Sequence, residues 1–141
     1  WRAMMRTGDV TLAAIAAKSE KESAYHVRHC SEWIVRLGDG TEESHRRAQE
    51  AIDELWAFTG EMFEIDDSER DLIDAGVAVD PGALRSQWLK TVSDVVNEAT
   101  LVLPSNGWMQ QGGRSGRHSE HLGHLLSELQ SMPRTFPGAT W

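Results

Sequence analysis

The chain has 141 residues, of which 40% are apolar and 26% charged, a composition that suits one globular domain with its own core. Its formal net charge of -8 repels phosphate backbones, which excludes a nucleic-acid-binding protein. The longest apolar run, Leu12–Ala17, is far shorter than the ~20 residues that span a bilayer. A single cysteine, Cys30, cannot form an internal disulfide, and no signal peptide is visible, so we expect a cytoplasmic protein that does not cross a membrane.

The beginning of the chain carries clear helix signals. Residues 1–6 lack an initiator methionine and have the pattern of a helix tail, so we expect a single domain over 1–141 that is an N-terminally truncated fragment. Asp9 or Thr7 is predicted to cap the next helix by accepting free backbone N–H groups. The apolar spacing predicts that this helix runs to about Leu37.

The inward stripe of this first helix is predicted to be polar at its centre. At helical spacing from Leu12, the inward positions are Ile15 and Ala16, Ser19, Glu22 and Ser23, His26, His29 and Cys30, Trp33 and Leu37. A buried lone carboxylate is unfavourable unless it is paired. We therefore expect the glutamate and the histidines to have a partner, a proton or a metal.

Turn residues then separate four further helices. Gly38 is predicted to supply a left-handed residue after the first helix, and Thr41 to cap a second helix that runs to about Glu64. So short a connection makes these two helices antiparallel neighbours. A third helix is predicted from the acidic run 66–69 to Gly76, and a fourth helix from Asp80-Pro81. A loop is predicted over 100–117, which includes Pro104-Ser105-Asn106-Gly107. A fifth helix is predicted from His118 to Met132, where Pro133 ends it. No alternating strand pattern is convincing, so the fold class is predicted to be all-α.

The histidine spacing bears on metal binding. Di-iron carboxylate bundles use a glutamate from each of two helices and a Glu-x-x-His pair from each of the other two. Only His45 has a glutamate three residues before it, Glu42, and that pair lies in a helix's first turn, where glutamate stabilises the helix dipole. The sequence therefore favours a solvated helix start over a metal ligand at this position.

Other metal groupings are weaker. Glu22 with His26, and Glu120 with His124, lie four residues apart, and either pair could hold half a metal site, although an ion pair is the favoured interpretation. The histidines of the fifth helix, His118, His121 and His124, have a spacing that zinc could use, but no second ligand cluster is evident.

We predict no catalytic and no cofactor-binding residue in this chain. Cys30, beside His26, His29 and Trp33, is interpreted as an inert buried thiol. The tryptophans, including Trp56 and Trp88, are interpreted as core or interface anchors, with the lining of a ligand pocket as the alternative.

Several separate motifs of one known family occur in this chain in the same order as in the family. They are Ala13–Lys18 with Glu22, Tyr25–His29, Trp33–His45, Ala78–Pro81, Asn97–Leu101, Gly113–Gly123 and Pro137–Trp141. The chain resembles the C-terminal portion of the PaaC-type subunits of bacterial phenylacetyl-CoA epoxidases, over almost its whole length. The departures noticed are at Ser23-Ala24 and Met132-Pro133, where bulkier or more polar residues are expected.

The resemblance implies a ferritin-like helical bundle and a role as a structural, non-catalytic subunit in a cytoplasmic multicomponent monooxygenase. The expected partner is a sister subunit that holds the di-iron centre, so no cofactor is expected in this chain. The spacing agrees, because Tyr25 and Gly123 stand where histidines would be needed after Glu22 and Glu120. The alternative is a di-iron carboxylate metalloprotein or oxygenase subunit that binds metal itself, with Glu22, His26 and Glu120 as ligands supplemented from an N-terminal half that this sequence lacks.

Overall fold

The computed structural model describes residues 1–105 and 107–140, and every regular element in them is helical. Asn106 of the predicted loop and Trp141 of the last motif lie outside the described residues. The all-α prediction is confirmed. No helix in the described ranges is both long and apolar enough to span a bilayer. In chain order the elements are η1 (Met4–Arg6), α1 (Val10–Gly38), α2 (Glu42–Leu55), η2 (Trp56–Phe58), η3 (Gly60–Phe63), α3 (Asp67–Asp74), η4 (Gly82–Leu84), α4 (Arg85–Glu98), η5 (Gly113–Ser115), α5 (Glu120–Leu129) and α6 (Ser131–Thr135), where η denotes a 3-10 helix.

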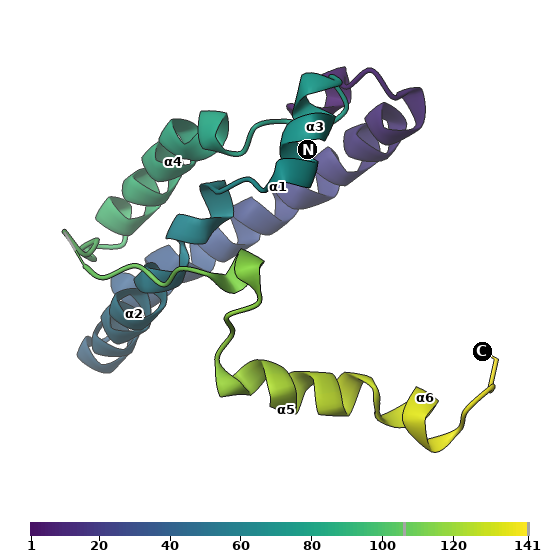
Figure 1. The fold of residues 1–141 in the computed structure, drawn as a ribbon. Coiled ribbons are helices and arrows are strands. Elements are labelled where there is room, and N and C mark those ends of the chain that lie inside the picture. Colours follow the sequence, from purple (N-terminus) through teal and green to yellow (C-terminus); the bar gives the residue numbers. More distant parts are fainter. Residues whose placement is uncertain (106, 141) are drawn as a thin grey trace.

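The long helix α1 is the element on which the others are assembled (Figure 1). Helices α2 and α4 pack against it, and η1 packs near its N-terminal end. The segment after α3 is tied to that same end, because the backbone N–H of Gly8 donates to the carbonyl of Gly76 at 3.0 Å and the Thr7 hydroxyl donates to the carbonyl of Val77 at 2.7 Å. Helices α5 and α6 project away from this body, and we call these two helices the C-terminal arm (Figure 1).

The buried core is small and lies where α1, α2 and the end of α4 meet. Val96, Ala99 and Leu101 form its centre. Apolar side chains from the three helices and from the segment after α4 surround them: Ile34, Val35, Ala48, Ile52, Val92 and Leu103. Gly38 and Ala99 allow the ends of α1 and α4 to approach closely, because a Cβ on Gly38 would overlap the carbonyl oxygen of Ala99.

The buried side of α1 agrees with the predicted stripe only in part. Of the predicted inward positions, Ala16 is fully buried and Ser19 and Ser23 are half-buried. Glu22, His26, His29 and Cys30 are all exposed, and the Trp33 side chain is 49% exposed. The buried side is completed instead by Gly38 and by half-buried Ser31, Ile34 and Val35. The prediction of a polar core on this helix was wrong, because it took Trp33 and Leu37 as inward when the neighbouring helices approach along the small-residue side.

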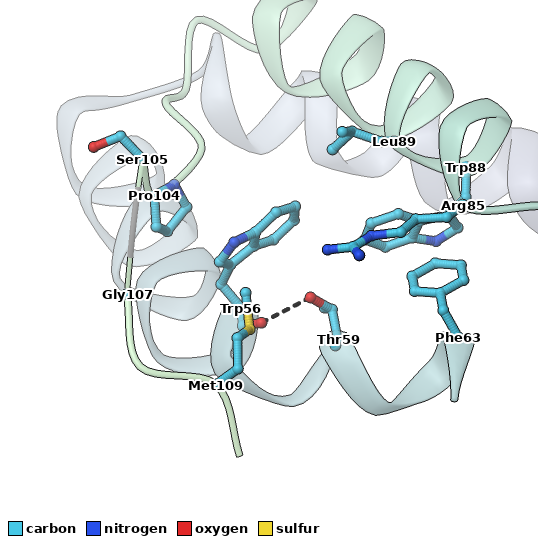
Figure 2. Close-up of a pocket in the computed structure, with 11 residues that line it drawn as sticks. Trp56, Thr59, Phe63, Arg85, Trp88, Leu89, Pro104, Ser105, Gly107 and Met109 are labelled. Carbon is cyan, nitrogen blue, oxygen red and sulfur yellow. Dashed lines mark hydrogen bonds between the residues drawn. The ribbon is translucent and has the colours of Figure 1, made fainter. Parts of the chain in front are cut away.

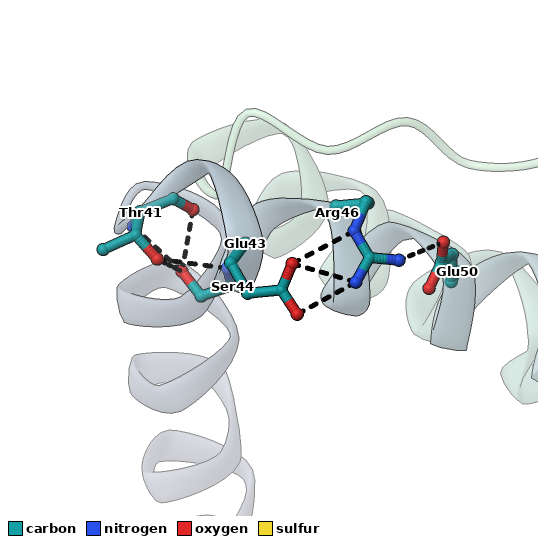
Figure 3. Close-up of polar contacts among 5 residues, drawn as sticks. All are labelled: Thr41, Glu43, Ser44, Arg46 and Glu50. Atoms are coloured by element: carbon teal, nitrogen blue, oxygen red, sulfur yellow. Dashed lines mark hydrogen bonds and ion pairs between the residues drawn. The ribbon is translucent and has the colours of Figure 1, made fainter.

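The predicted helix starts are largely confirmed by their caps. Asp9 accepts hydrogen bonds from the backbone N–H groups of Thr11 and Leu12, at 2.8 and 2.9 Å. Thr41 and Ser44 form a reciprocal capping box at the start of α2 (Figure 3).

Helix α2 continues with a surface ion-pair network (Figure 3). Arg46 binds Glu43 at 2.9 Å and Glu50 at 2.6 Å. The hydrogen bonds that the Arg46 guanidinium donates to Glu43 and then to Glu50 raise its pKa, although all three side chains are exposed. Such exposed pairs add little to stability.

Three local predictions need correction. Gly38 is the last residue of α1 rather than a left-handed residue after it; the left-handed glycines described are Gly76, Gly112, Gly116 and Gly138. Helix α2 ends at Leu55, and the predicted stretch to Glu64 is two 3-10 turns. Pro133 does not end the fifth helix; it lies in the first turn of α6, where its missing N–H has no helical partner to lose.

Candidate functional site

The exposed face of α1 carries a row of aromatic and basic side chains. The Tyr25 ring stacks on His29 at 6.0 Å between centroids, and His29 meets the Trp33 ring edge-on at 6.4 Å. Arg28 and Arg36 lie over the rings of Tyr25 and Trp33, at 5.5 and 5.4 Å. These polar groups are exposed to solvent in the described structure, so they need no buried partner, proton or metal to offset desolvation.

The three candidate metal ligands do not come together. Glu22 and His26 lie on the middle of α1, whereas Glu120 opens α5, which projects away from α1 in the C-terminal arm (Figure 1). All three side chains are exposed. In the described ranges, no three His, Cys, Asp or Glu side chains converge on a point where a metal ion could sit. Glu22, His26 and Glu120 therefore do not form a common metal site in the described structure.

His45 has a structural role at the end of α1. Its Nδ1 lies 2.7 Å from the carbonyl oxygen of Gly38, and the ring is half-buried. With the proton on Nδ1, the ring donates to a carbonyl that the helix leaves without a partner at its C-terminus. Glu42 stands exposed in the first turn of α2, as the sequence favoured.

The histidines of the fifth helix are on the arm. His118 precedes α5, and His121 and His124 lie in it; all three are exposed. The face opposite His124 is apolar, with half-buried Leu122 and exposed Leu125, Leu126 and Leu129. This clean division of faces identifies α5 as an amphipathic helix with an apolar stripe open to solvent.

An aromatic pocket lies between the 3-10 turns after α2 and the start of α4 (Figure 2). Its volume is about 290 Å³. Trp56 and Trp88 stack with centroids 5.7 Å apart and planes at 26°, and Phe63 meets Trp88 at 5.2 Å and 64°. Other lining residues include Leu89, Pro104 and Met109.

Backbone and hydroxyl hydrogen bonds hold the pocket's shape. The Thr59 hydroxyl donates to the carbonyl of Trp56 at 2.8 Å (Figure 2), which stabilises the first 3-10 turn. The backbone N–H of Gln110 donates to the carbonyl of Ala57 at 2.9 Å and fixes the stretch of loop that carries Met109. These contacts hold the two 3-10 turns and the loop in place beside Trp88, which Trp56 and Phe63 contact.

One charged side chain enters this pocket. The Arg85 guanidinium lies 5.8 Å from the centroid of Phe63 and extends across the pocket toward Trp56 and Thr59 (Figure 2). Arg85 also lines an adjoining groove of about 220 Å³, together with Glu64, Gln110 and Gln111. Among the described residues, Arg85 has no carboxylate within ion-pair distance.

The sequence did not identify this pocket as a site. It interpreted Trp56 and Trp88 as core or interface anchors, with the lining of a ligand pocket as the alternative. The structure places both half-buried at a solvent-accessible hollow. The sequence signal that could have indicated the pocket was the spacing of seven residues between Trp56 and Phe63. That spacing brings two side chains to one face of a continuous helix as well, so it did not distinguish a pocket from a helix face.

The described chain contains a long central helix with amphipathic helices around it, and every regular element is helical. This architecture and the family match place the chain in the class of ferritin-like helical bundles. A family model described as "Phenylacetic acid catabolic protein" matches residues 1–141. The chain belongs to that family, and the resemblance noted from its motifs is confirmed.

A curated relative agrees with the family match. The chain is 44% identical over 138 residues to the subunit designated C of the 1,2-phenylacetyl-CoA epoxidase of Escherichia coli (strain K12). The match covers 98% of this chain and 56% of the relative. The chain therefore spans about half the length of the curated relative it matches.

Proposed function

We propose that this chain is part of a non-catalytic structural subunit that pairs with the di-iron catalytic subunit of a bacterial phenylacetyl-CoA ring-epoxidising monooxygenase, in the cytoplasm. Family membership and the name of the relative support the choice of complex. The single observation that carries the non-catalytic role is the separation of Glu120, on α5, from Glu22 and His26, on α1; all three side chains are exposed. Oxygen chemistry would then belong to the partner.

The exposed apolar surface supports a role in assembly. The α5 stripe leaves Leu125 53% and Leu129 68% exposed, and Trp33 stands open on α1. Large contiguous apolar patches on one molecule mark protein interfaces more often than free surface. A subunit whose work is to hold a partner needs such surfaces and needs no metal of its own.

The test uses the full-length protein, expressed alone and together with the catalytic subunit. We expect co-purification of the two proteins in a fixed ratio, and no bound iron in the full-length protein alone above the level of a protein with no metal site. Glu22→Gln and Glu120→Gln should leave the iron content and the epoxidation rate of the complex unchanged, because neither carboxylate would be a ligand.

Two results would contradict the proposal. Stoichiometric iron in the isolated subunit that disappears in Glu22→Gln would support the alternative, a metalloprotein with Glu22, His26 and Glu120 as ligands. A monomer that does not bind the catalytic subunit at any mixing ratio would remove the structural role.

A further inference from the structure

We propose that the aromatic pocket of Trp56, Phe63 and Trp88 is a binding site for a small aromatic carboxylate, with the ring against the indoles and the carboxylate on Arg85. The pocket is built entirely from this chain. It lies between the 3-10 turns and α4, apart from the α1 face and the α5 stripe. The inference therefore does not rest on the proposed function.

The apolar lining defines the ring's place. Indole and phenyl faces from Trp56, Trp88 and Phe63 meet the flat side of Pro104 and the flexible thioether of Met109 at one hollow (Figure 2). Aromatic side chains favour stacked or edge-on contact with another ring, and methionine sulfur packs well at ring edges. A planar aromatic ligand makes both contacts here.

The volume limits the ligand's size. An apolar cavity of about 150 Å³ accommodates benzene, and this pocket measures about 290 Å³. One ring with a chain of a few atoms fills that space. The volume lies at the lower end of the ~300–1,000 Å³ range of drug-sized ligand pockets, so larger multi-ring ligands would protrude.

Arg85 defines the charge. The Arg85 guanidinium reaches across the pocket and lies over the Phe63 ring (Figure 2). Among the residues that the structure describes, no carboxylate forms an ion pair with it. A guanidinium binds a carboxylate through two parallel hydrogen bonds. Glu64 lines the adjoining groove and adds a negative charge nearby, which disfavours a doubly charged phosphate relative to a singly charged carboxylate.

Binding of phenylacetate to the full-length protein tests the proposal, with phenylacetamide as an uncharged ligand of nearly the same shape. Isothermal titration calorimetry should show saturable phenylacetate binding that Arg85→Gln weakens by about tenfold or more, since a charge-assisted bidentate contact is lost. Arg47→Gln, a change at an exposed arginine of α2 that lines neither hollow, should leave binding unchanged. Phenylacetamide should bind wild type and Arg85→Gln equally weakly.

A second measurement locates the ligand and guards against misfolding of the variant. Circular dichroism should show equal helix content in wild type and Arg85→Gln. Crystals soaked with 4-iodophenylacetate should show the anomalous iodine signal between Trp56 and Met109. Three results would each overturn the proposal: no binding of phenylacetate, equal binding of the acid and the amide, or an iodine signal outside the pocket.

Discussion

Replacement of Gly38 by alanine tests how closely α1 and α4 must approach. Gly38 is buried at the end of α1, against Ala99 at the end of α4. A Cβ on Gly38 would overlap the Ala99 carbonyl oxygen and lie 2.8 Å from the Ala99 Cβ. Ordinary carbon contacts need ~3.5–4.0 Å, so the two helix ends must separate by roughly 1 Å.

The expected loss follows from two opposing effects. An added methyl group in a packed site destabilises by about 1–3 kcal/mol. Alanine gains up to ~1 kcal/mol over glycine in helix propensity, and less at a last helical residue. The separation also strains the hydrogen bonds that the Gly38 carbonyl accepts from His45 Nδ1 at 2.7 Å and from the Thr100 hydroxyl at 3.4 Å. We expect the free energy of unfolding to fall by about 1–2 kcal/mol.

Urea denaturation of the full-length protein, followed by circular dichroism, measures this change. With an m-value of about 2 kcal/mol/M, the midpoint should fall by about 0.5–1 M. Gly123→Ala is the matched control, because Gly123 is exposed within α5 and a Cβ there has no neighbour within 4 Å. If Gly38→Ala unfolds at the wild-type urea concentration, or Gly123→Ala loses as much as Gly38→Ala, the close-approach argument is refuted.

Three further changes probe the local structure of the same protein. Thr41→Ala removes the capping box of α2 and should lower the free energy of unfolding by about 1 kcal/mol, with faster amide exchange confined to the first turn of α2; uniform exchange would contradict it. His45→Ala leaves the Gly38 carbonyl without its imidazole donor and should cost about 0.5–1.5 kcal/mol in urea denaturation, whereas an unchanged midpoint would show that solvent replaces the ring. Glu61→Ala removes the carboxylate that accepts the backbone N–H of Gly113 at 2.9 Å, so trypsin should cleave the segment after Gly113 sooner than in wild type, and an equal cleavage rate would argue that this contact does not hold the arm's base.

The sequence by itself determined features that depend on a few neighbouring residues. The helix starts after Asp9, Thr41 and Asp66 follow from side-chain oxygens that accept backbone N–H groups two or three residues ahead. The apolar stripe of α5 follows from its leucine spacing alone. The family motifs were likewise readable without a structure, since they are local strings of residues.

Only the tertiary structure decided which side of α1 is buried and where a pocket forms. The predicted stripe and the buried side share Ala16, Ser19 and Ser23. Contact with Ala99, 61 positions further along the chain than Gly38, decides that Gly38 is buried while Trp33 and Leu37 are exposed. The end of α2 at Leu55 likewise brings Trp56 onto Trp88. Capping and periodicity are set within a helical turn, whereas burial depends on which distant segments pack together, and no local pattern contains that information.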